Sequence, residues 1–353
     1  MSDGLQRLLT GIPEDVRAVN TRGSWRRAAR AWVLDRVAAP LSRWYGPRDP
    51  ETFGILMYHR VAPVISGLPT PTWSVTPERL RSQLHGLLAR GFQAWPLEKI
   101  LAYRMHGRPL PPRTFAVTFD DGYENNLTLG FPILEELRVP ATIFLATRYL
   151  DSAFPFPFDD WTASGSHAVP NELWRPLTRN QCRQLRDSGL VSLGAHTHSH
   201  GDFRNKPLEF AVDLEECLES LAVRFGISEP TLALPFGCKS MGSAGPMFSE
   251  IAEQAGCRTC LSTEAGVLRL DESPFDWGRF EATGHDTADT LAAKLDGWWD
   301  RVRQVLRVAK RAWPGSKPQW RDLRIGTSEG GGPALPEQEE ILELAEAVAR
   351  EQS

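Results

Sequence analysis

Short apolar runs alternate with helical stretches through the middle of the chain. The apolar runs predict strands at residues 54–59, 114–119, 141–145, 191–195 and 231–234. Apolar positions at helical spacing predict helices around residues 133–137, 178–188, 208–225 and 248–255. Strands that alternate with helices in this way are typical of a parallel α/β sheet or barrel.

A further helix is marked by residues at both of its ends. Thr76 followed by Pro77 is a typical N-cap and first-turn pair. The buried face of this helix is predicted at Leu80, Leu84, Leu87 and Leu88. We expect the helix to end at Gly91, because glycine commonly terminates helices.

Two basic amphipathic stretches flank the alternating region. In the first, apolar residues recur at helical spacing between arginines, at Trp25, Ala29, Trp32, Val33 and Val37. In the second, at residues 298–313, one face carries Val302, Val305, Leu306 and Ala309. Each stretch is expected to form a helix that packs on the flank of the protein. The alternative is a helix that lies on an anionic membrane surface.

These patterns divide the chain into three parts. Residues 1–50 form a basic amphipathic helical extension, residues 51–300 the central α/β domain, and residues 301–353 a helical and acidic tail. Within the central domain, the aromatic, Pro-rich segment 151–176 is expected to be an insertion over one end of the sheet. Its Asp159-Asp160-Trp161 sequence could contact a sugar, although a loop turn is the preferred interpretation.

Composition excludes several classes of protein. With 353 residues and 41% hydrophobic composition, the chain can form one enzyme domain of barrel size with extensions. A formal charge of -4 and a pI near 6.1 indicate no general basic surface, so we expect no nucleic-acid partner. The five cysteines are expected to be reduced thiols, mostly in the core, and Cys257 and Cys260 are expected to bind no metal.

The N-terminal residues favour a cytoplasmic protein. Acidic residues stand where a signal peptide needs a basic start followed by a long apolar run. No stretch approaches the roughly 20 apolar residues that a membrane span requires. We therefore expect a cytoplasmic location, with the basic helices allowing peripheral contact with the inner membrane face.

Two adjacent carboxylates and a glycine end the predicted strand at residues 114–119. Adjacent side chains diverge at a strand end, so one of Asp120 and Asp121 can hold a metal while the other faces a reacting water. Gly122 lets the backbone turn sharply beneath them. Taken alone, the motif is equally compatible with a solvated turn.

Three of the eight histidines lie within five residues, directly after the strand at 191–195. If the chain enters a helical turn there, His196 and His200 project to one side and can bind one ion, while His198 points elsewhere. Two imidazoles and one carboxylate leave coordination positions for water and a substrate carbonyl. The expected cofactor is a divalent metal, with zinc preferred because it suits amide or ester hydrolysis.

The motifs TFDDG at 118–122 and HTHSH at 196–200 together resemble those of the NodB-homology polysaccharide deacetylases. The resemblance covers about residues 53–297 and implies a distorted (β/α) barrel, here with added N-terminal and C-terminal helices. It also implies that Asp120 is the general base and that Asp121, His196 and His200 are the metal ligands. LPFG at 234–237 resembles the third motif, which implies that the backbone at Phe236 stabilises the oxyanion.

Two departures from the family pattern concern the base and the acid. Ala233 stands where many members have an arginine that orients the base, and Arg279 is our candidate to replace it. The late Leu-x-His motif that often supplies the acid is absent. The first strand, ILMYHRV, resembles that of poly-N-acetylglucosamine deacetylases, which implies that His59 is the acid. His285 is a weaker alternative, and Asp276-Trp277 could match the motif that tunes the acid.

The expected activity is removal of N-acetyl groups from an amino-sugar glycan or its precursor. Within enzymology, the alternatives are deformylation of a lipid-linked amino sugar and hydrolysis of a C–N bond in a small cyclic compound. The basic helices favour a lipid-linked or nucleotide-linked amino sugar as the partner. A catalytically inactive sugar-binding relative is the alternative of a different class.

Overall fold

The computed structural model describes residues 34–66, 68, 71–163 and 169–304. The predictions for residues 25–33 and for the tail beyond residue 304 lie outside these ranges. Two compact units are separated at Asp49 and Leu291, one being Asp49–Leu291 and the other including the described residues 34–48 and 292–304. None of the helices among the described residues is long and apolar enough to cross a membrane.

The smaller unit contains η2 (Leu34–Ala38), α3 (Ala39–Tyr45) and helical residues at 298–304. The Ser42 hydroxyl donates to Asp296 Oδ2 at 2.7 Å, and the Trp298 indole donates to the Gly46 carbonyl at 2.8 Å. These contacts join two segments that are far apart in the sequence.

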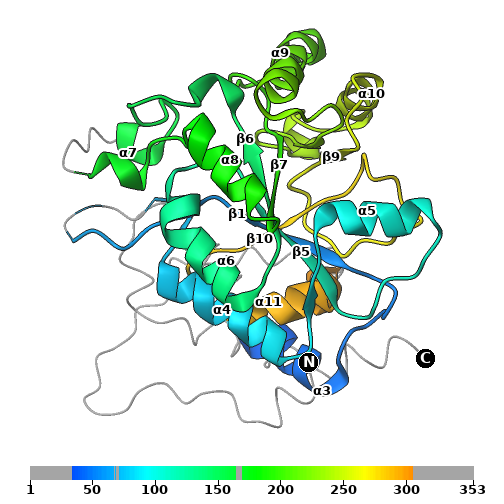
Figure 1. Ribbon diagram of the computed structural model, residues 1–353. Coiled ribbons are helices and arrows are strands. Elements are labelled where there is room, and N and C mark those ends of the chain that lie inside the picture. Colours follow the sequence, from blue (N-terminus) through cyan, green and yellow to red (C-terminus); the bar gives the residue numbers. More distant parts are fainter. Residues whose placement is uncertain (1–33, 67, 69–70, 164–168, 305–353) are drawn as a thin grey trace, which may run out of the picture. The chain divides into compact units, whose positions relative to one another are not determined.

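The larger unit is built on a curled parallel sheet. Its strands are β1 (Gly54–Tyr58), β4 (Gln93–Ala94), β5 (Thr114–Phe119), β6 (Ala141–Leu145), β7 (Val191–Ala195), β8 (Thr231–Ala233), β9 (Thr259–Leu261) and β10 (Phe280–Glu281). Their order is β10-β1-β5-β6-β7-β8-β9, with β4 paired to β5, and every pair is parallel. The predicted distorted (β/α) barrel is confirmed, as a curled half-barrel with surrounding helices (Figure 1).

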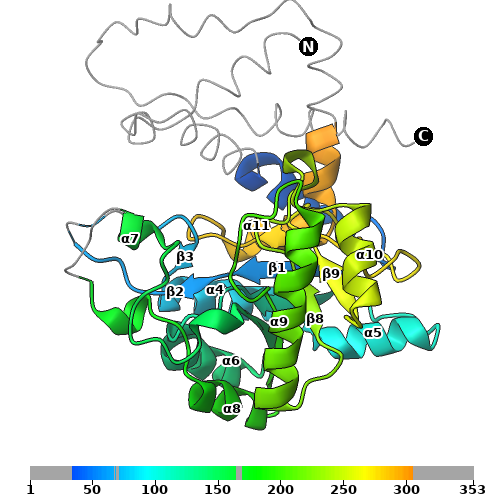
Figure 2. The ribbon, with the colours of Figure 1, turned by 90° about the horizontal axis from the view of Figure 1, so that it is seen from above.

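Helices surround the curled sheet (Figures 1 and 2). They are α4 (Pro77–Ala89), α5 (Leu97–Met105), α6 (Phe131–Leu137), α8 (Arg179–Asp187), α9 (Pro207–Phe225) and α10 (Pro246–Gln254), and α11 (Ala288–Leu295) follows β10. The Thr76 hydroxyl accepts a hydrogen bond from the Arg79 amide, as an N-cap should. Gly91, with φ 79°, turns the chain after α4, so the predicted start and end of this helix are confirmed.

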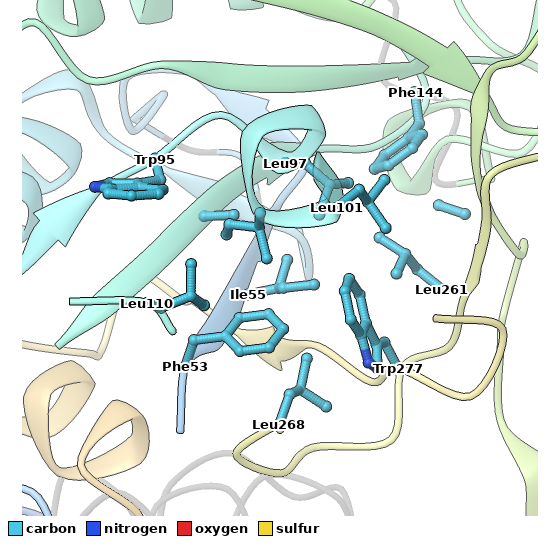
Figure 3. Close-up of a cluster of buried hydrophobic side chains, with 13 residues drawn as sticks. Phe53, Ile55, Trp95, Leu97, Leu101, Leu110, Phe144, Leu261, Leu268 and Trp277 are labelled. Atoms are coloured by element: carbon cyan, nitrogen blue, oxygen red, sulfur yellow. The ribbon is translucent and has the colours of Figure 1, made fainter. Parts of the chain in front are cut away.

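The sequence patterns did not predict α5, β9 or β10. Both α5 and β9 contribute to a buried cluster of apolar side chains, through Leu97, Leu101 and Leu261, and Trp277 joins it three residues before β10 (Figure 3). In that cluster the Phe53 and Trp277 rings meet edge to face at 5.0 Å, and Ala233 is fully buried. The contact of Trp277 anchors the segment that leads into β10.

The insertion at 151–176 is anchored by its own acidic sequence. Its described residues include α7 (Asp160–Ala163) and η5 (Asn171–Leu173). Asp159 is buried and forms an ion pair with Arg60, whose guanidinium lies over the Trp161 ring at 4.4 Å. Trp161 is only 1% exposed, so Asp159 and Trp161 are not available to a sugar. Instead of the expected loop turn, Asp160 and Trp161 begin α7, and the Trp161 amide donates to Asp159 Oδ1 at 2.9 Å.

All five cysteines are free thiols, and all except Cys238 are buried. This confirms that they are mostly core residues. Burial raises the pKa of the Cys257 thiol to about 12, so the free thiol is protonated at neutral pH.

Candidate active site

The candidate residues lie after the carboxyl ends of four parallel strands. His59 follows β1, Asp120 and Asp121 follow β5, His196 follows β7, and Phe236 lies shortly after β8. Because these strands are parallel, their carboxyl ends lie at one edge of the sheet, where α/β enzymes commonly place their sites. The fold therefore brings residues from four distant sequence segments to one region.

Asp121, His196 and His200 form a group of potential metal ligands. Their ligand atoms all lie within 4.8 Å of one another. Asp121 Oδ1 is 3.4 Å from His196 Nε2 and 3.2 Å from His200 Nε2. Burial would raise the pKa of Asp121, but the two imidazoles hold that pKa well below its ordinary value. The Asp121 carboxylate is therefore ionised, as metal binding requires.

Unusual backbone conformations bring these three side chains together. Asp121 has φ 71°, Thr197 φ 63° and His200 φ 54°, all in the left-handed region. Such conformations cost about 1–3 kcal/mol each in residues other than glycine, and they concentrate at functional sites. The helical turn that was one way to bring His196 and His200 together does not form, because residues 196–200 contain only bends and irregular backbone. Positive φ angles, rather than helical spacing, direct His196 and His200 toward Asp121.

The histidine loop is held by a partner that the sequence did not indicate. Asp213 in α9 accepts hydrogen bonds from the backbone amides of His198 and Ser199, at 2.6 and 3.1 Å, and pairs with the Ser199 hydroxyl. His198 points elsewhere, as predicted, since its Nδ1 contacts Thr147 Oγ1 at 3.0 Å. Asp213 could not be recognised in advance, because acidic residues are common on exposed helix faces.

Further contacts orient the two imidazoles. His196 Nδ1 lies 2.8 Å from the Ala233 carbonyl, which can only accept a hydrogen bond, so Nδ1 carries a proton. In the neutral imidazole, Nε2 then has the free lone pair that a metal ion would use. Phe158 of the insertion stacks on His200, with ring centroids 4.0 Å apart and planes at 19°. The insertion thus reaches the candidate metal ligands, a contact that the sequence did not predict.

Arg279 lies against Asp120. Its guanidinium nitrogens donate to the two Asp120 oxygens at 2.6 and 2.8 Å, and the Arg279 side chain is fully buried. Burial alone would raise the pKa of Asp120, but the charges of Arg279, His196 and His59 and the hydrogen bonds from Arg279 together outweigh it, so this pKa is lowered. Arg279, the residue directly before β10, thus makes the contact with Asp120 that was expected of the candidate replacing the arginine absent at Ala233. Gly278 lets the chain pass close to the Glu264 carbonyl.

His59 lies near the Asp120 carboxylate. Its Nε2 is 3.9 Å from Asp120 Oδ2, and its side chain is 15% exposed. Burial lowers the pKa of His59, while the charges of Asp120 and Asp121 act in the opposite direction. The Asn126 side chain donates to the His59 carbonyl at 2.7 Å, which fixes the turn between β1 and β2 (Arg60–Val61).

The other sequence candidates lie in different environments. Phe236, with φ 60°, is half exposed and its ring contacts that of His200 at 5.3 Å. His285 is exposed, and its backbone amide donates to Thr283 Oγ1. Asp276 is exposed and paired with Lys239, while Trp277 is in the core. Of these acid candidates, His59 lies 3.9 Å from Asp120. Among the described residues, no contact joins Asp120 to His285 or Asp276.

The donor set fits a divalent cation. Ligands about 2.0–2.2 Å from a tetrahedral ion are roughly 3.4 Å apart, which is close to the separations at Asp121. Asp121 Oδ1 is buried and accepts no hydrogen bond from the described residues, although two imidazole nitrogens lie beside it. A cation between these three groups would satisfy that oxygen.

Comparison with known proteins agrees with this geometry. Residues 107–259 match the family model described as polysaccharide deacetylase, a range that includes Asp120, Asp121, His196, His200 and Phe236. The chain contains a polysaccharide deacetylase domain. Both His59 and Arg279 lie outside the residues matched to this deacetylase domain, so their assignment depends on the geometry described above.

The relatives of this deacetylase domain include poly-beta-1,6-N-acetyl-D-glucosamine N-deacetylases. That of Escherichia coli strain K12 is 34% identical over 128 residues, which are 36% of this chain and 18% of the relative. That of Staphylococcus aureus strain MRSA252 is 24% identical over 238 residues, covering 65% of this chain and 74% of the relative. The chain thus spans less than a fifth of the length of the E. coli protein.

Solved structures show the same fold. IcaB from Ammonifex degensii aligns with a TM-score of 0.57 at 23% identity, over 69% of this chain and 97% of that chain. A de-N-acetylase from Aggregatibacter actinomycetemcomitans aligns with a TM-score of 0.58 at 18% identity, over 69% of this chain and 100% of that chain.

Proposed function

We propose that this protein is a metal-dependent hydrolase that removes N-acetyl groups from an amino-sugar glycan. The observation that carries the proposal is the convergence of Asp121, His196 and His200 beside an Asp120 carboxylate held by Arg279. The poly-N-acetylglucosamine deacetylases among the relatives support this choice of acyl group and sugar.

Asp121, His196 and His200 would hold the cation. When bound, a divalent metal supplies Lewis-acid polarisation of the acetyl carbonyl and lowers the pKa of a nearby water. Asp120 takes the proton from the attacking water, and its lowered pKa keeps it ionised and able to do so at neutral pH. Arg279 orients both carboxylate oxygens through its paired donors.

His59 and Phe236 complete the proposed cycle. The backbone N–H of Phe236 donates to the oxyanion that forms when water attacks the carbonyl carbon. His59, which is close to Asp120, delivers a proton to the nitrogen as the C–N bond breaks. The products are acetate and an amino sugar. Phe236 has an unusual φ of 60°, and such strained conformations concentrate at functional sites, which fits this role.

The finer predictions on metal, substrate form and location belong to the same proposal. Zinc is proposed because two imidazoles and one carboxylate with open positions are typical of catalytic zinc sites. Use of a lipid-linked or nucleotide-linked amino sugar and membrane contact are proposed from the basic sequence at both flanks. A cytoplasmic location is proposed with them. Cosedimentation with anionic liposomes at low salt tests the membrane contact, which a wholly soluble protein would contradict.

Acetate release tests the proposed reaction. We would incubate wild-type protein with zinc and N-acetylglucosamine oligomers and compare it with Asp120→Asn, using Asp202→Asn as a matched exposed control. We expect Asp120→Asn to lose at least a hundredfold of the rate, because general bases contribute about 10²–10⁴-fold. Asp202, paired with Arg204 at the surface, should be dispensable. Release that survives Asp120→Asn would contradict the assignment of the base.

A further inference from the structure

A partly exposed tryptophan stacks on the candidate acid. Trp73 is 44% exposed, and its ring lies 5.0 Å from that of His59 with the planes at 26°. His59 in turn lies 3.9 Å from Asp120. Trp73 therefore presents indole surface to solvent only one side chain away from the candidate catalytic carboxylate. Nothing in the family motifs indicated this residue.

The backbone around Trp73 is fixed on both sides. The Arg60 amide donates to the Trp73 carbonyl at 3.1 Å, within the pairing of β2 with β3 (Ser74–Val75). The preceding Thr72 amide donates to Asp160 Oδ2 of the insertion at 2.7 Å. The indole is therefore positioned before any ligand binds, which reduces the entropy cost of using it as a binding surface.

The proposed reaction determines what must lie beside His59. The acid must reach the nitrogen that departs from the sugar, and this nitrogen is bonded directly to a carbon of the sugar ring. The ring is therefore within one covalent bond of the atom that His59 protonates. Indoles offer a rigid apolar face that packs against the apolar C–H face of a sugar, so the neighbouring exposed ring is suited to that contact.

A second exposed aromatic ring is connected to the other carboxylate of the pair. Phe236 is 51% exposed and contacts His200, which is 3.2 Å from Asp121. Trp73 contacts His59, which lies near Asp120. Each carboxylate thus has an exposed aromatic ring one side chain away.

We propose that Trp73 is a specificity-determining residue whose indole stacks on a sugar ring of the glycan at the site of hydrolysis. This inference rests on the proposed deacetylase function and deepens it. Trp73 selects substrates that carry a sugar ring next to the acetamide, while the acyl chemistry is carried out by Asp120, His59 and the metal ligands.

Steady-state kinetics with zinc tests the inference on four proteins: wild type, Trp73→Ala, Trp73→Phe and the control Trp44→Ala. Trp44 is an exposed tryptophan of the smaller unit, 57% exposed. The substrates are N-acetylglucosamine oligomers and ethyl acetate, which has no sugar ring. For Trp73→Ala we expect KM on the oligomers to rise about three- to tenfold, the range of an aromatic stacking contact. Its kcat/KM on ethyl acetate should stay within about twofold.

The other outcomes distinguish the two proposals. Trp73→Phe should recover most of the loss, and Trp44→Ala should match wild type. An unchanged KM for the oligomers in Trp73→Ala would overturn the role of Trp73. A fall in kcat on both substrates at constant KM would also overturn it, because Trp73 would then only position His59. If wild type released acetate from ethyl acetate but from no amino sugar, both the proposed function and this inference would be overturned.

Discussion

Removing the Arg279 guanidinium should destabilise the protein by leaving a charge buried without its partner. Arg279 is fully buried, and the Asp120 side chain is 3% exposed. In the variant Arg279→Met, a side chain of similar length replaces the two donors that lie 2.6 and 2.8 Å from Asp120. Breaking a buried ion pair by removing one partner costs about 3–5 kcal/mol.

A double-mutant cycle separates this cost from that of altered packing. Asp120→Asn alone strands the guanidinium and should cost a similar amount, whereas the double variant contains neither charge. We therefore expect the double variant to be more stable than the sum of the single losses predicts, by about 2 kcal/mol or more. A Coulomb energy of about 4 kcal/mol for unit charges 4 Å apart at an effective dielectric of 20 sets the scale.

Urea unfolding at pH 7 in the presence of a chelator measures these free energies without a contribution from bound metal. Arg81→Met provides the matched control, because Arg81 pairs with Glu136 at 3.1 Å while both side chains are about half exposed. That variant should lose about 0–1 kcal/mol. The reasoning would be refuted if Arg279→Met lost no more stability than Arg81→Met, or if the cycle were additive.

Two further predictions concern the insertion. Burial would raise the pKa of Glu124, but hydrogen bonds from Arg175 and Gln181 lower it below the unfolded value, near 4.5. Ionised Glu124 therefore stabilises the fold above pH 4.5, and this stabilisation is lost as the pH falls through the pKa of Glu124 in the folded protein. Glu124→Gln should therefore be about 1–2 kcal/mol less stable than wild type at pH 7. In urea titrations, the difference in unfolding free energy between the two proteins should narrow below pH 4.5. A difference that stays constant with pH would contradict this prediction. Phe158→Leu removes the ring stacked on His200 and should weaken zinc binding about three- to tenfold in competition with a chromophoric chelator, with Phe154→Leu as control. Equal affinities in the two variants would show that the stacking does not orient the ligand.

The fold was largely predictable because buried parallel strands and amphipathic helices leave periodic patterns. The predicted strands at residues 114–119, 141–145 and 191–195 have the bounds that the structure shows. In contrast, β10 has only two residues and owes its place to pairing with β1, through Leu56 and Phe280. A strand that is held by a distant partner has no local pattern to detect.

The candidate site was predictable in composition but not in geometry. Local motifs indicated Asp121, His196 and His200, but no helical turn after His196 brings the two histidines together. Their convergence depends on left-handed φ angles at non-glycine residues, which residue type does not reveal. Trp73 and Phe158 could not be recognised either, because an aromatic residue in a loop is compatible with many packing arrangements.

Chelation and metal restoration during acetate release test the central claim most directly. Wild-type protein would be stripped with a chelator, dialysed and titrated with zinc, while acetate released from N-acetylglucosamine oligomers is measured, with His196→Ala as the variant without one ligand. The account predicts that release stops in the stripped protein and returns at about one equivalent of zinc, and that His196→Ala stays inactive at this zinc level. Undiminished release by the stripped wild-type protein would contradict a metal-dependent deacetylase.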